Sequence, residues 1–320
     1  MPNDHTACSC HQPSTTASHY RGDNVDAPAE SAEMRRLLDG IGIDSVIDVH
    51  THFMPAQVLD KVWAYFDSAG PMTGREWPIR YRHDEQSRVA LLRALGVSTF
   101  TSLLYPHKPN MAAWLNNWAT DFATATPDCL HSATFYPEPD APDYVGHAID
   151  AGARVFKAHI QVGDYSPLDP LLDPVWAMLT AKSIPTVIHA GSGPAPGRFT
   201  GPDRVSAVLD RHPGLPLIIA HMGMPEYREF LDLAQRHDTV YLDTTMVFTD
   251  FIETSEPFTA DARRDLESLG ERILFGSDYP NIPYPYPHAV ESVIRLGFGE
   301  AWSRNVLRDN AARLFGIPVD

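Results

Sequence analysis

Cysteine is scarce in this chain of 320 residues, which contains only Cys8, Cys10 and Cys129. An odd and scattered set of cysteines is not typical of a disulfide framework. No run of about 18 apolar residues occurs, so we expect no membrane-spanning helix. The stretch from Met1 to Arg21 also has no apolar segment of the kind found in secretory signals. We therefore expect a chain that works in the reducing cytoplasm.

Positive charge is also sparse, because 41 acidic residues outnumber 25 basic ones and give a formal net charge of −16. Such a chain repels nucleic acid and anionic lipid at long range, and no basic run offsets this. Neither a G-x-G-x-x-G motif nor a P-loop follows the first predicted strand, where dinucleotide or phosphate binding would require it. The expected partner is a small-molecule substrate.

Large apolar side chains are nearly missing from the stretch up to Glu30, which is rich in Ser, Thr, Ala, Pro, His and Asp. Such a composition buries too little surface to offset the entropy lost on ordering. The sequence predicts a disordered tail over residues 1–40, with one short helix over Glu33–Leu38, and a single folded domain over residues 41–320. The cysteines and histidines near the start lack the paired spacing of a structural zinc site.

From Ile43 onward, short β-branched apolar runs alternate with helical patterns. Near-continuous apolar runs are typical of parallel strands that are covered on both faces. Eight β-then-α units over about 275 residues predict an α/β fold of the (β/α)₈ TIM-barrel type. The predicted strands are Ser45–Val49, Thr99–Leu104, Ser132–Phe135, Ala153–Ala158, Thr186–Ile188, Pro216–Ala220, Thr239–Leu242 and Arg272–Phe275.

Several of these strands end at a histidine, a lysine or an aspartate. In a barrel the carboxyl ends of the strands meet at one mouth, where catalysis takes place in this fold. The residues at these ends are His50, His52, Lys157, His159, His189, His221 and Asp278.

A metal site is the chemistry that this pattern favours. His50 and His52 are two residues apart on a strand, so both side chains point to the same face. His189 and Asp278 add a third nitrogen and a carboxylate oxygen. This ligand set suits one divalent ion, for which we prefer Zn²⁺ over Mn²⁺, Fe²⁺ or Co²⁺. A lone buried histidine is more often structural than metal-binding, so the prediction depends on the combination.

Three segments together resemble the amidohydrolase superfamily. They are Val46–Phe53 (VIDVHTHF), Ile218–Gly223 (IIAHMG) and Leu274–Pro280 (LFGSDYP). The resemblance spans about residues 43–317 and is strongest to the amidohydrolase 2 group, which also contains aminocarboxymuconate-semialdehyde decarboxylase. It implies a metal-dependent barrel, with His50, His52, His189 and Asp278 as ligands. It also implies that Asp278 accepts a proton from metal-bound water, while His221 beside the metal polarises the substrate or moves a proton.

Lys157 departs from the mononuclear members of that superfamily. In binuclear members, a carbamylated lysine on the fourth strand bridges two metals. The alternative is a lysine that binds an anionic substrate or pairs with Asp278, and we expect a single metal. His159, two residues on, faces the same way and is a second predicted substrate contact. Asp48 is either a partner of the ligands or a buried strand-end carboxylate.

Two loops are predicted to contribute to specificity. The long connection from Phe66 to Asp84 contains arginines that would suit a carboxylate-bearing substrate. The loop after the fifth strand lies on the mouth side and carries Arg198, a third predicted substrate contact. Tyr105 and His107 are expected at the rim, and the segment Tyr279–Pro287 is expected to form a wall.

Two reactions fit the same residues. The first is hydrolysis of an amide, lactone or similar carbonyl bond by metal-activated water, and it is preferred because it is the commoner chemistry in the superfamily. The alternative is non-oxidative decarboxylation of an unsaturated or aromatic acid. A barrel that has lost activity and acts as a binding protein would be expected to lack ligands, and none is missing here. Self-association into a homo-oligomer is compatible with the acidic surface.

Overall fold

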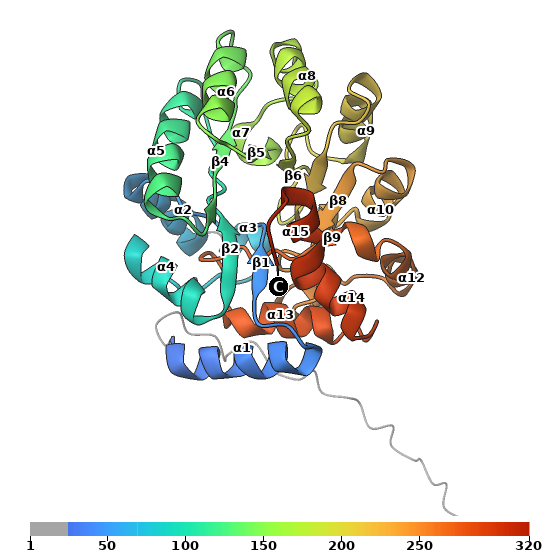
Figure 1. Ribbon diagram of the computed structural model, residues 1–320. Coiled ribbons are helices and arrows are strands. Elements are labelled where there is room, and N and C mark those ends of the chain that lie inside the picture. Colours follow the sequence, from blue (N-terminus) through green and yellow to red (C-terminus); the bar gives the residue numbers. More distant parts are fainter. Residues whose placement is uncertain (1–24, 69, 320) are drawn as a thin grey trace, which may run out of the picture.

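The protein is a closed barrel of parallel strands surrounded by helices, seen in a computed structural model that describes residues 25–68 and 70–319 (Figure 1). The wall of the barrel consists of two hydrogen-bonded sheets, with the strand orders β1-β2-β3 and β4-β5-β6-β7-β8-β9. The backbone amide of Val49 donates to the carbonyl of Phe275 at 2.9 Å, which joins the last strand to the first. The strands are β1 Val46–Asp48, β2 Val97–Thr101, β3 Cys129–Leu130, β4 Ser132–Thr134, β5 Val155–His159, β6 Thr186–His189, β7 Leu217–Ile219, β8 Val240–Asp243 and β9 Ile273–Leu274.

All eight predicted strands are present, and the third is divided in two. β3 pairs with β2, and β4 pairs with β5, with only His131 between them. The division therefore marks the residue at which one strand changes from one neighbour to the other. The predicted (β/α)₈ fold is confirmed.

Helices follow the strands and cover the outside of the barrel (Figure 1). Prolines open several of them, as at Pro202 in α9, and Asp84 caps α4 by accepting from the amide of Ser87 at 2.8 Å. The helices are α1 Ala27–Ile41, α2 Ala56–Ser68, α3 Gly70–Thr73, α4 Glu85–Ala94, α5 Ala112–Ala125, α6 Ala141–Asp150, α7 Ile160–Gly163, α8 Asp173–Lys182, α9 Pro202–Arg211, α10 Tyr227–Arg236, α11 Asp250–Glu253, α12 Ala260–Ser268, α13 Tyr286–Ile294, α14 Glu300–Arg304 and α15 Asn310–Phe315. Single turns occur at η1 Pro170–Leu172, η2 Ala220–Gly223, η3 Gly270–Arg272 and the π-turn η4 Asn305–Asp309.

The strands are buried on both faces, which explains their apolar sequences. One cluster fills the barrel and includes Ile47, Val187 and Ile218. A larger cluster lies between the strands and the helices and includes Phe156 and Trp176. Within the described residues, no helix is long and apolar enough to cross a membrane.

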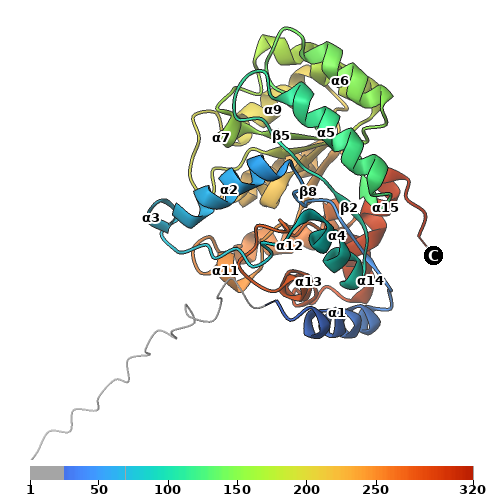
Figure 2. The same cartoon turned by 90° about the vertical axis from the view of Figure 1, so that its left-hand side faces the viewer.

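The predicted disordered tail is wrong for residues 27–40, where the short helix expected over Glu33–Leu38 is part of a longer one. Helix α1 begins after Asp26, whose side chain accepts from the amide of Ala29, and it packs against α13 and α14 below the barrel (Figure 2). Met34, Leu37, Leu38 and Ile41 bury a stripe at helical spacing. This stripe supplies enough apolar surface to dock the helix. The prediction missed it because the polar residues before it dominate the average composition of residues 1–40. The cysteines and histidines before residue 25 lie outside the described residues.

Candidate active site

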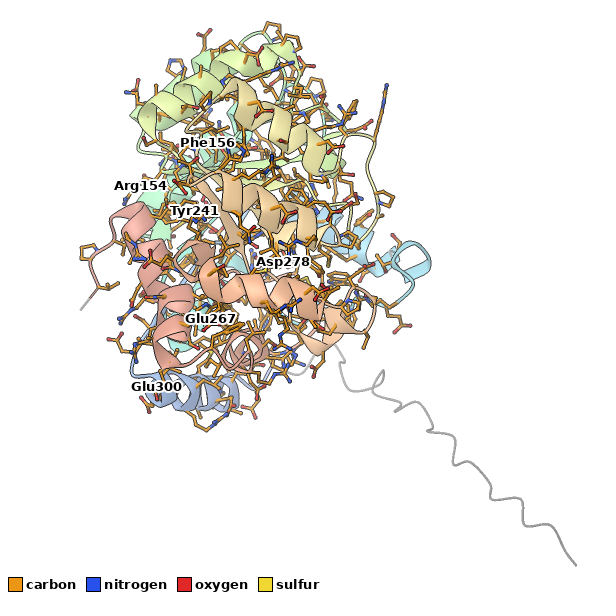
Figure 3. All side chains as sticks on the ribbon, turned by 90° about the vertical axis from the view of Figure 1, so that its right-hand side faces the viewer. Arg154, Phe156, Tyr241, Glu267, Asp278 and Glu300 are labelled. Carbon is orange, nitrogen blue, oxygen red and sulfur yellow. The ribbon has the colours of Figure 1, made fainter. Side chains whose placement is uncertain are left out.

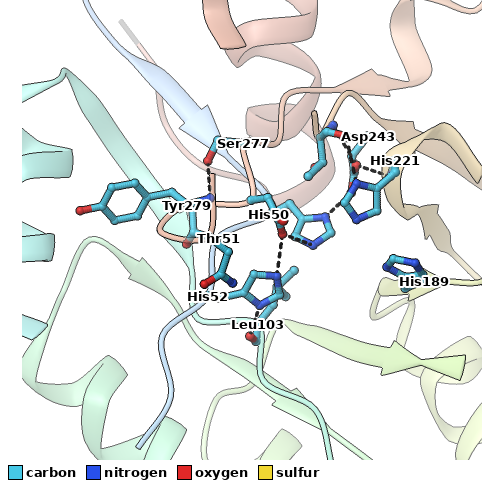
Figure 4. A network of polar contacts seen from close by, with 12 residues as sticks. His50, Thr51, His52, Leu103, His189, His221, Asp243, Ser277 and Tyr279 are labelled. Atoms are coloured by element: carbon cyan, nitrogen blue, oxygen red, sulfur yellow. Dashed lines mark hydrogen bonds and ion pairs between the residues drawn. The ribbon is translucent and has the colours of Figure 1, made fainter. Parts of the chain in front are cut away.

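The side chains predicted to form the site lie together at the carboxyl ends of the strands. In Figure 3, Arg154 marks the amino-terminal end of the barrel, and Asp278 lies toward the opposite end. Helices α2 and α3 project on the side away from α15 (Figure 2). Figure 4 shows the rings of His50, His52, His189 and His221 around one space.

Three ligand atoms are close enough to share one ion. His50, His52 and Asp278 are buried, and one ligand atom from each lies within 4.8 Å of the others. The Oδ1 atom of Asp278 is 2.9 Å from Nε2 of His52 and 3.6 Å from Nε2 of His50. Two imidazole nitrogens and a carboxylate oxygen form a donor set suited to a divalent transition metal.

The other nitrogen of each imidazole is held by an acceptor. Nδ1 of His50 donates to Oδ2 of Asp243 at 2.8 Å, and Nδ1 of His52 donates to the carbonyl of Leu103 at 2.7 Å. Burial, followed by the charge of Lys157, lowers the pKa of His50 well below its usual value, so this ring is neutral. Each Nε2 therefore presents a lone pair toward the Asp278 carboxylate. Two imidazole lone pairs and a carboxylate oxygen gathered at this range could all bind one divalent ion, so the residues fit a metal.

The backbone around the ligands is tightly constrained. Asp278 adopts a left-handed conformation (φ 74°), and its amide donates to the carbonyl of His50 at 2.9 Å. A Cβ on Gly276 would lie 2.2 Å from Oγ1 of Thr245 and 2.7 Å from Cβ of His50. Only glycine allows this close approach.

Asp48 anchors this backbone rather than facing the pocket. Its Oδ1 accepts from the amides of His50 and Ser277, both at 3.1 Å, and its Oδ2 accepts from the hydroxyl of Tyr286 at 2.8 Å. Burial raises its pKa to about 7. Of the two predicted alternatives, Asp48 is a buried strand-end carboxylate that holds the segments on which the candidate ligands stand.

His189 lines the same space but is not part of the three-atom group. Its Nε2 donates to the carbonyl of Gly193 at 3.1 Å, and its ring stacks on His159 with centroids 4.1 Å apart. Burial, with the charge of Lys157, lowers its pKa to about 4. The role of His189 as a further ligand remains a prediction.

His221 adjoins the candidate ligands, with its ring centroid 5.1 Å from that of His50. Its Nδ1 donates to the carbonyl of Thr245 at 3.0 Å, and burial, then the neighbouring His189 and His50, lowers its pKa well below the usual value. A neutral ring held in this way offers a lone pair at Nε2. It can accept a proton or a hydrogen bond from substrate, whereas donation to an oxyanion requires its protonated form.

Lys157 points at the candidate metal site. Its ammonium nitrogen is 3.2 Å from Nε2 of His50, and the side chain is fully buried. Burial lowers its pKa to about 8, although the charges of Asp243 and Asp278 act in the opposite direction. Lys157 is therefore placed to contact whatever group binds beside His50.

Asp243, at the end of β8, was missed by the sequence reasoning. Besides holding His50 through Oδ2, its Oδ1 accepts from the backbone amides of His221 and Thr245 at 2.8 and 3.1 Å. The signal was present, because the apolar strand Val240–Leu242 also stops at an acidic residue. Asp243 fixes His50 and the backbone of His221 relative to each other.

A pocket of about 750 Å³ opens from this site, and residues of α2 and of the segment after β2 are among those that line it. Lys157, His159, Tyr105 and His107 line it, as expected. The ring of His159 lies between those of His189 and Tyr105, at centroid distances of 4.1 and 4.7 Å. The remaining lining is mainly aromatic and apolar, and it includes Val58, Val62, Tyr65, Phe66, Trp77, Met111, Trp114, Met224 and Met246.

The predicted contact of Arg198 with substrate is not supported. This side chain is exposed, is not among the pocket-lining residues, and lies over the ring of Phe199 at 4.9 Å. A loop that starts on the mouth side can still direct a side chain outward.

The arginines of the loop Phe66–Asp84 are likewise engaged elsewhere. Arg75 bonds the carbonyl of Phe251, Arg80 pairs with Glu30, and Arg82 pairs with Asp67. This loop supplies Trp77 to the pocket instead of a guanidinium.

The expected aromatic wall after β9 is also wrong. Tyr279, Tyr284 and Tyr286 are fully buried in the core, because they pack beneath the site. Asn281 is the residue of this segment that reaches the pocket.

Comparison with known proteins places the chain in a family. A family model described as Amidohydrolase matches residues 47–317. The chain therefore belongs to the amidohydrolase family, and it is an enzyme of that family.

Individual relatives agree with this assignment. Gamma-resorcylate decarboxylase of Rhodococcus jostii (strain RHA1) is 29% identical over 198 residues, which are 56% of this chain and 51% of that protein. The match thus spans about half the length of that curated relative.

Two solved structures share the barrel. An uncharacterized TIM-barrel protein from Bordetella bronchiseptica has a TM-score of 0.69 at 21% identity, covering 85% of this chain and 98% of that chain. A dihydroxybenzoic acid decarboxylase from Polaromonas sp. JS666, with bound manganese and the inhibitor 2-nitroresorcinol, has a TM-score of 0.61 at 18% identity, covering 87% and 98%. At these identities the likeness establishes the fold.

Proposed function

We propose that the protein is a metal-dependent, non-oxidative decarboxylase of an aromatic acid. The observation that carries the proposal is the compact group of His50, His52 and Asp278 at the base of a pocket with mainly aromatic and apolar walls. The names of the relatives support it, because they favour the alternative reaction predicted from the sequence over hydrolysis. No feature of the pocket specifically favours an amide or lactone.

One divalent ion is the proposed cofactor. His50, His52 and Asp278 would hold it, with His189 as a candidate fourth ligand. Manganese in the Polaromonas decarboxylase makes Mn²⁺ a better first choice than the Zn²⁺ preferred from the sequence. When bound, such an ion supplies a Lewis-acidic centre that orients oxygen atoms of the substrate.

The chain's own residues would supply the remaining chemistry. Lys157 and His159 bind and orient the acid group, and the aromatic walls hold the ring and exclude water. Asp278 in its protonated form gives its proton to the ring carbon that bears the carboxylate. The bond between that carbon and the carboxylate then breaks, its electron pair stays with the ring, and CO₂ leaves. Asp278 recovers a proton from solvent.

A panel of acids and esters tests this proposal. Protein loaded with Mn²⁺ is incubated with 2,6-dihydroxybenzoate, other hydroxybenzoates, and matched aryl lactones and amides. We expect CO₂ and the corresponding phenol from at least one acid, and a loss of about 10²-fold or more in rate for Asp278→Asn. In D₂O the phenol should carry one deuterium at the carbon that lost the carboxylate. Hydrolysis of a lactone or amide without CO₂ release from any acid would contradict the proposal.

A further inference from the structure

Lysine has an unusual distribution in this protein. The sequence contains four lysines, Lys61, Lys108, Lys157 and Lys182, and the first three line the pocket. Lys182 lies exposed in the last turn of α8. Asp278 is the one carboxylate among the described lining residues, and no arginine lines the pocket. A chain with a net charge of −16 thus places an excess of positive charge in its pocket.

Two of these lysines lie at the exposed opening of the pocket, unlike the third. Lys61 is on α2 and Lys108 is in the loop between β2 and α5, and both are exposed, unlike the fully buried Lys157. His107 precedes Lys108 in the chain and lines the same pocket, and burial, followed by the charges of Lys108 and Lys61, lowers its pKa. We call Lys61, His107 and Lys108 the rim cation cluster.

The rim cation cluster has no acidic partner within the described part of the chain. No ion pair or hydrogen bond there involves Lys61 or Lys108, although many of the arginines are paired with carboxylates, as Arg93 is with Asp128. Cations gathered beside low-dielectric walls concentrate anions at the opening. The cluster is therefore available to a ligand.

The size of the pocket leaves space for a ligand that reaches from the base to this cluster. An apolar cavity of about 150 Å³ is enough for benzene, whereas this pocket measures about 750 Å³. A single-ring acid held at His50, His52 and Asp278 fills only part of it. Tyr65, Trp77 and Trp114 supply aromatic surface in the remaining part.

We propose that the rim cation cluster is a second anion subsite, and that the substrate is an aryl acid whose far end carries another anionic group, such as a carboxylate or sulfonate. This inference rests on the proposed function for the fate of the first carboxylate. The second group stays intact and binds between Lys61 and Lys108, while the apolar middle of the molecule contacts the aromatic side chains.

Exposed apolar residues at the mouth raise the question of a second copy of the chain. Tyr65, Trp114 and Val162 are 48%, 41% and 39% exposed. In a symmetric dimer the same surface patch meets itself, which would bring two rim cation clusters near each other. Repulsion between the two clusters would oppose such a dimer. An anionic ligand is therefore the better candidate to occupy the surface around the rim cation cluster.

Equilibrium binding tests the subsite without turnover. Biphenyl-4-carboxylate and biphenyl-4,4′-dicarboxylate are titrated into the full chain, metal-free and Mn²⁺-loaded, by calorimetry. We expect the dicarboxylate to bind about tenfold more tightly to the wild type, since each exposed ion pair contributes a few-fold. Raising NaCl from about 20 to about 300 mM should reduce this preference.

Two variants locate the effect. In Lys61→Gln/Lys108→Gln the preference should fall below about twofold while the affinity for the monocarboxylate is unchanged. Lys182→Gln removes the one lysine outside the pocket and should keep the wild-type preference.

Equal affinity for the two probes in the wild type, or binding of neither, overturns the subsite. So does a preference that survives the double substitution, or a double substitution that changes only the oligomeric state. Absence of CO₂ release in the substrate panel would instead count against the proposed reaction, because the binding ratio does not depend on it.

Discussion

Asp243 is the residue on which the geometry of the candidate site depends most. It accepts the Nδ1 proton of His50 with one oxygen and two backbone amides with the other. Carboxylates that hold a ligating histidine in this way fix its tautomer and raise its basicity.

Replacing Asp243 with asparagine should damage the site without removing any ligand. The backbone amides of His221 and Thr245 would still donate to the side-chain oxygen of the new asparagine. The NH₂ group of the asparagine would therefore face Nδ1 of His50. That nitrogen must then accept, and the proton moves to Nε2, where the ion would bind. We expect Mn²⁺ affinity to fall about 10- to 100-fold, measured by metal titration. Asp210→Asn, an exposed change on α9, is the control. Unchanged affinity in Asp243→Asn would contradict this role.

The sequence predicted individual residues best where a strand ends. His50, His52, His189 and Asp278 each follow an apolar run, so the barrel brings them to one mouth. Lys61 and Trp114 were not predicted as pocket residues because they lie on helices, and a helical pattern does not show which exposed side chain faces a pocket. Arg80 was misjudged because its partner, Glu30, lies in a segment predicted to be disordered.

At the scale of elements, α1 connects the chain's amino-terminal part to the site. Glu30 pairs with Arg80 and accepts from the hydroxyl of Tyr81 at 2.5 Å. That hydroxyl in turn accepts from the amide of Tyr286, whose own hydroxyl donates to Asp48. A continuous polar chain therefore runs from α1 to the segments on which the candidate ligands stand.

The packing of α1 should contribute measurably to stability. Leu38 is 3% exposed. Its side chain packs against Gly96, because a Cβ added to that glycine would lie 3.4 Å from Cδ1 of Leu38. Leu38→Ala should lower the free energy of unfolding by about 2–4 kcal/mol, measured by urea denaturation. Arg35→Ala, an exposed change on the same helix, should alter it by less than about 0.5 kcal/mol. Equal stability of the two variants would mean that α1 is not docked.

At the scale of the whole molecule, charge is separated between surface and pocket. The chain as a whole is strongly acidic, while the pocket has three lysines and one carboxylate. The sequence predicted the barrel because its periodic strands determine the topology. It could not predict this separation, because the pocket walls come from segments that meet only in the folded chain.

The central claim is that one divalent ion at His50, His52 and Asp278 enables decarboxylation. The most direct test is the rate of CO₂ release from the best acid of the panel, plotted against Mn²⁺ bound per chain as metal-free protein is reloaded in bicarbonate-containing buffer. We predict no release without metal and a linear rise that stops at about one ion per chain. A rise that continues to about two ions would instead indicate a binuclear site bridged by Lys157. Full activity in the metal-free protein would contradict the metal-dependent account.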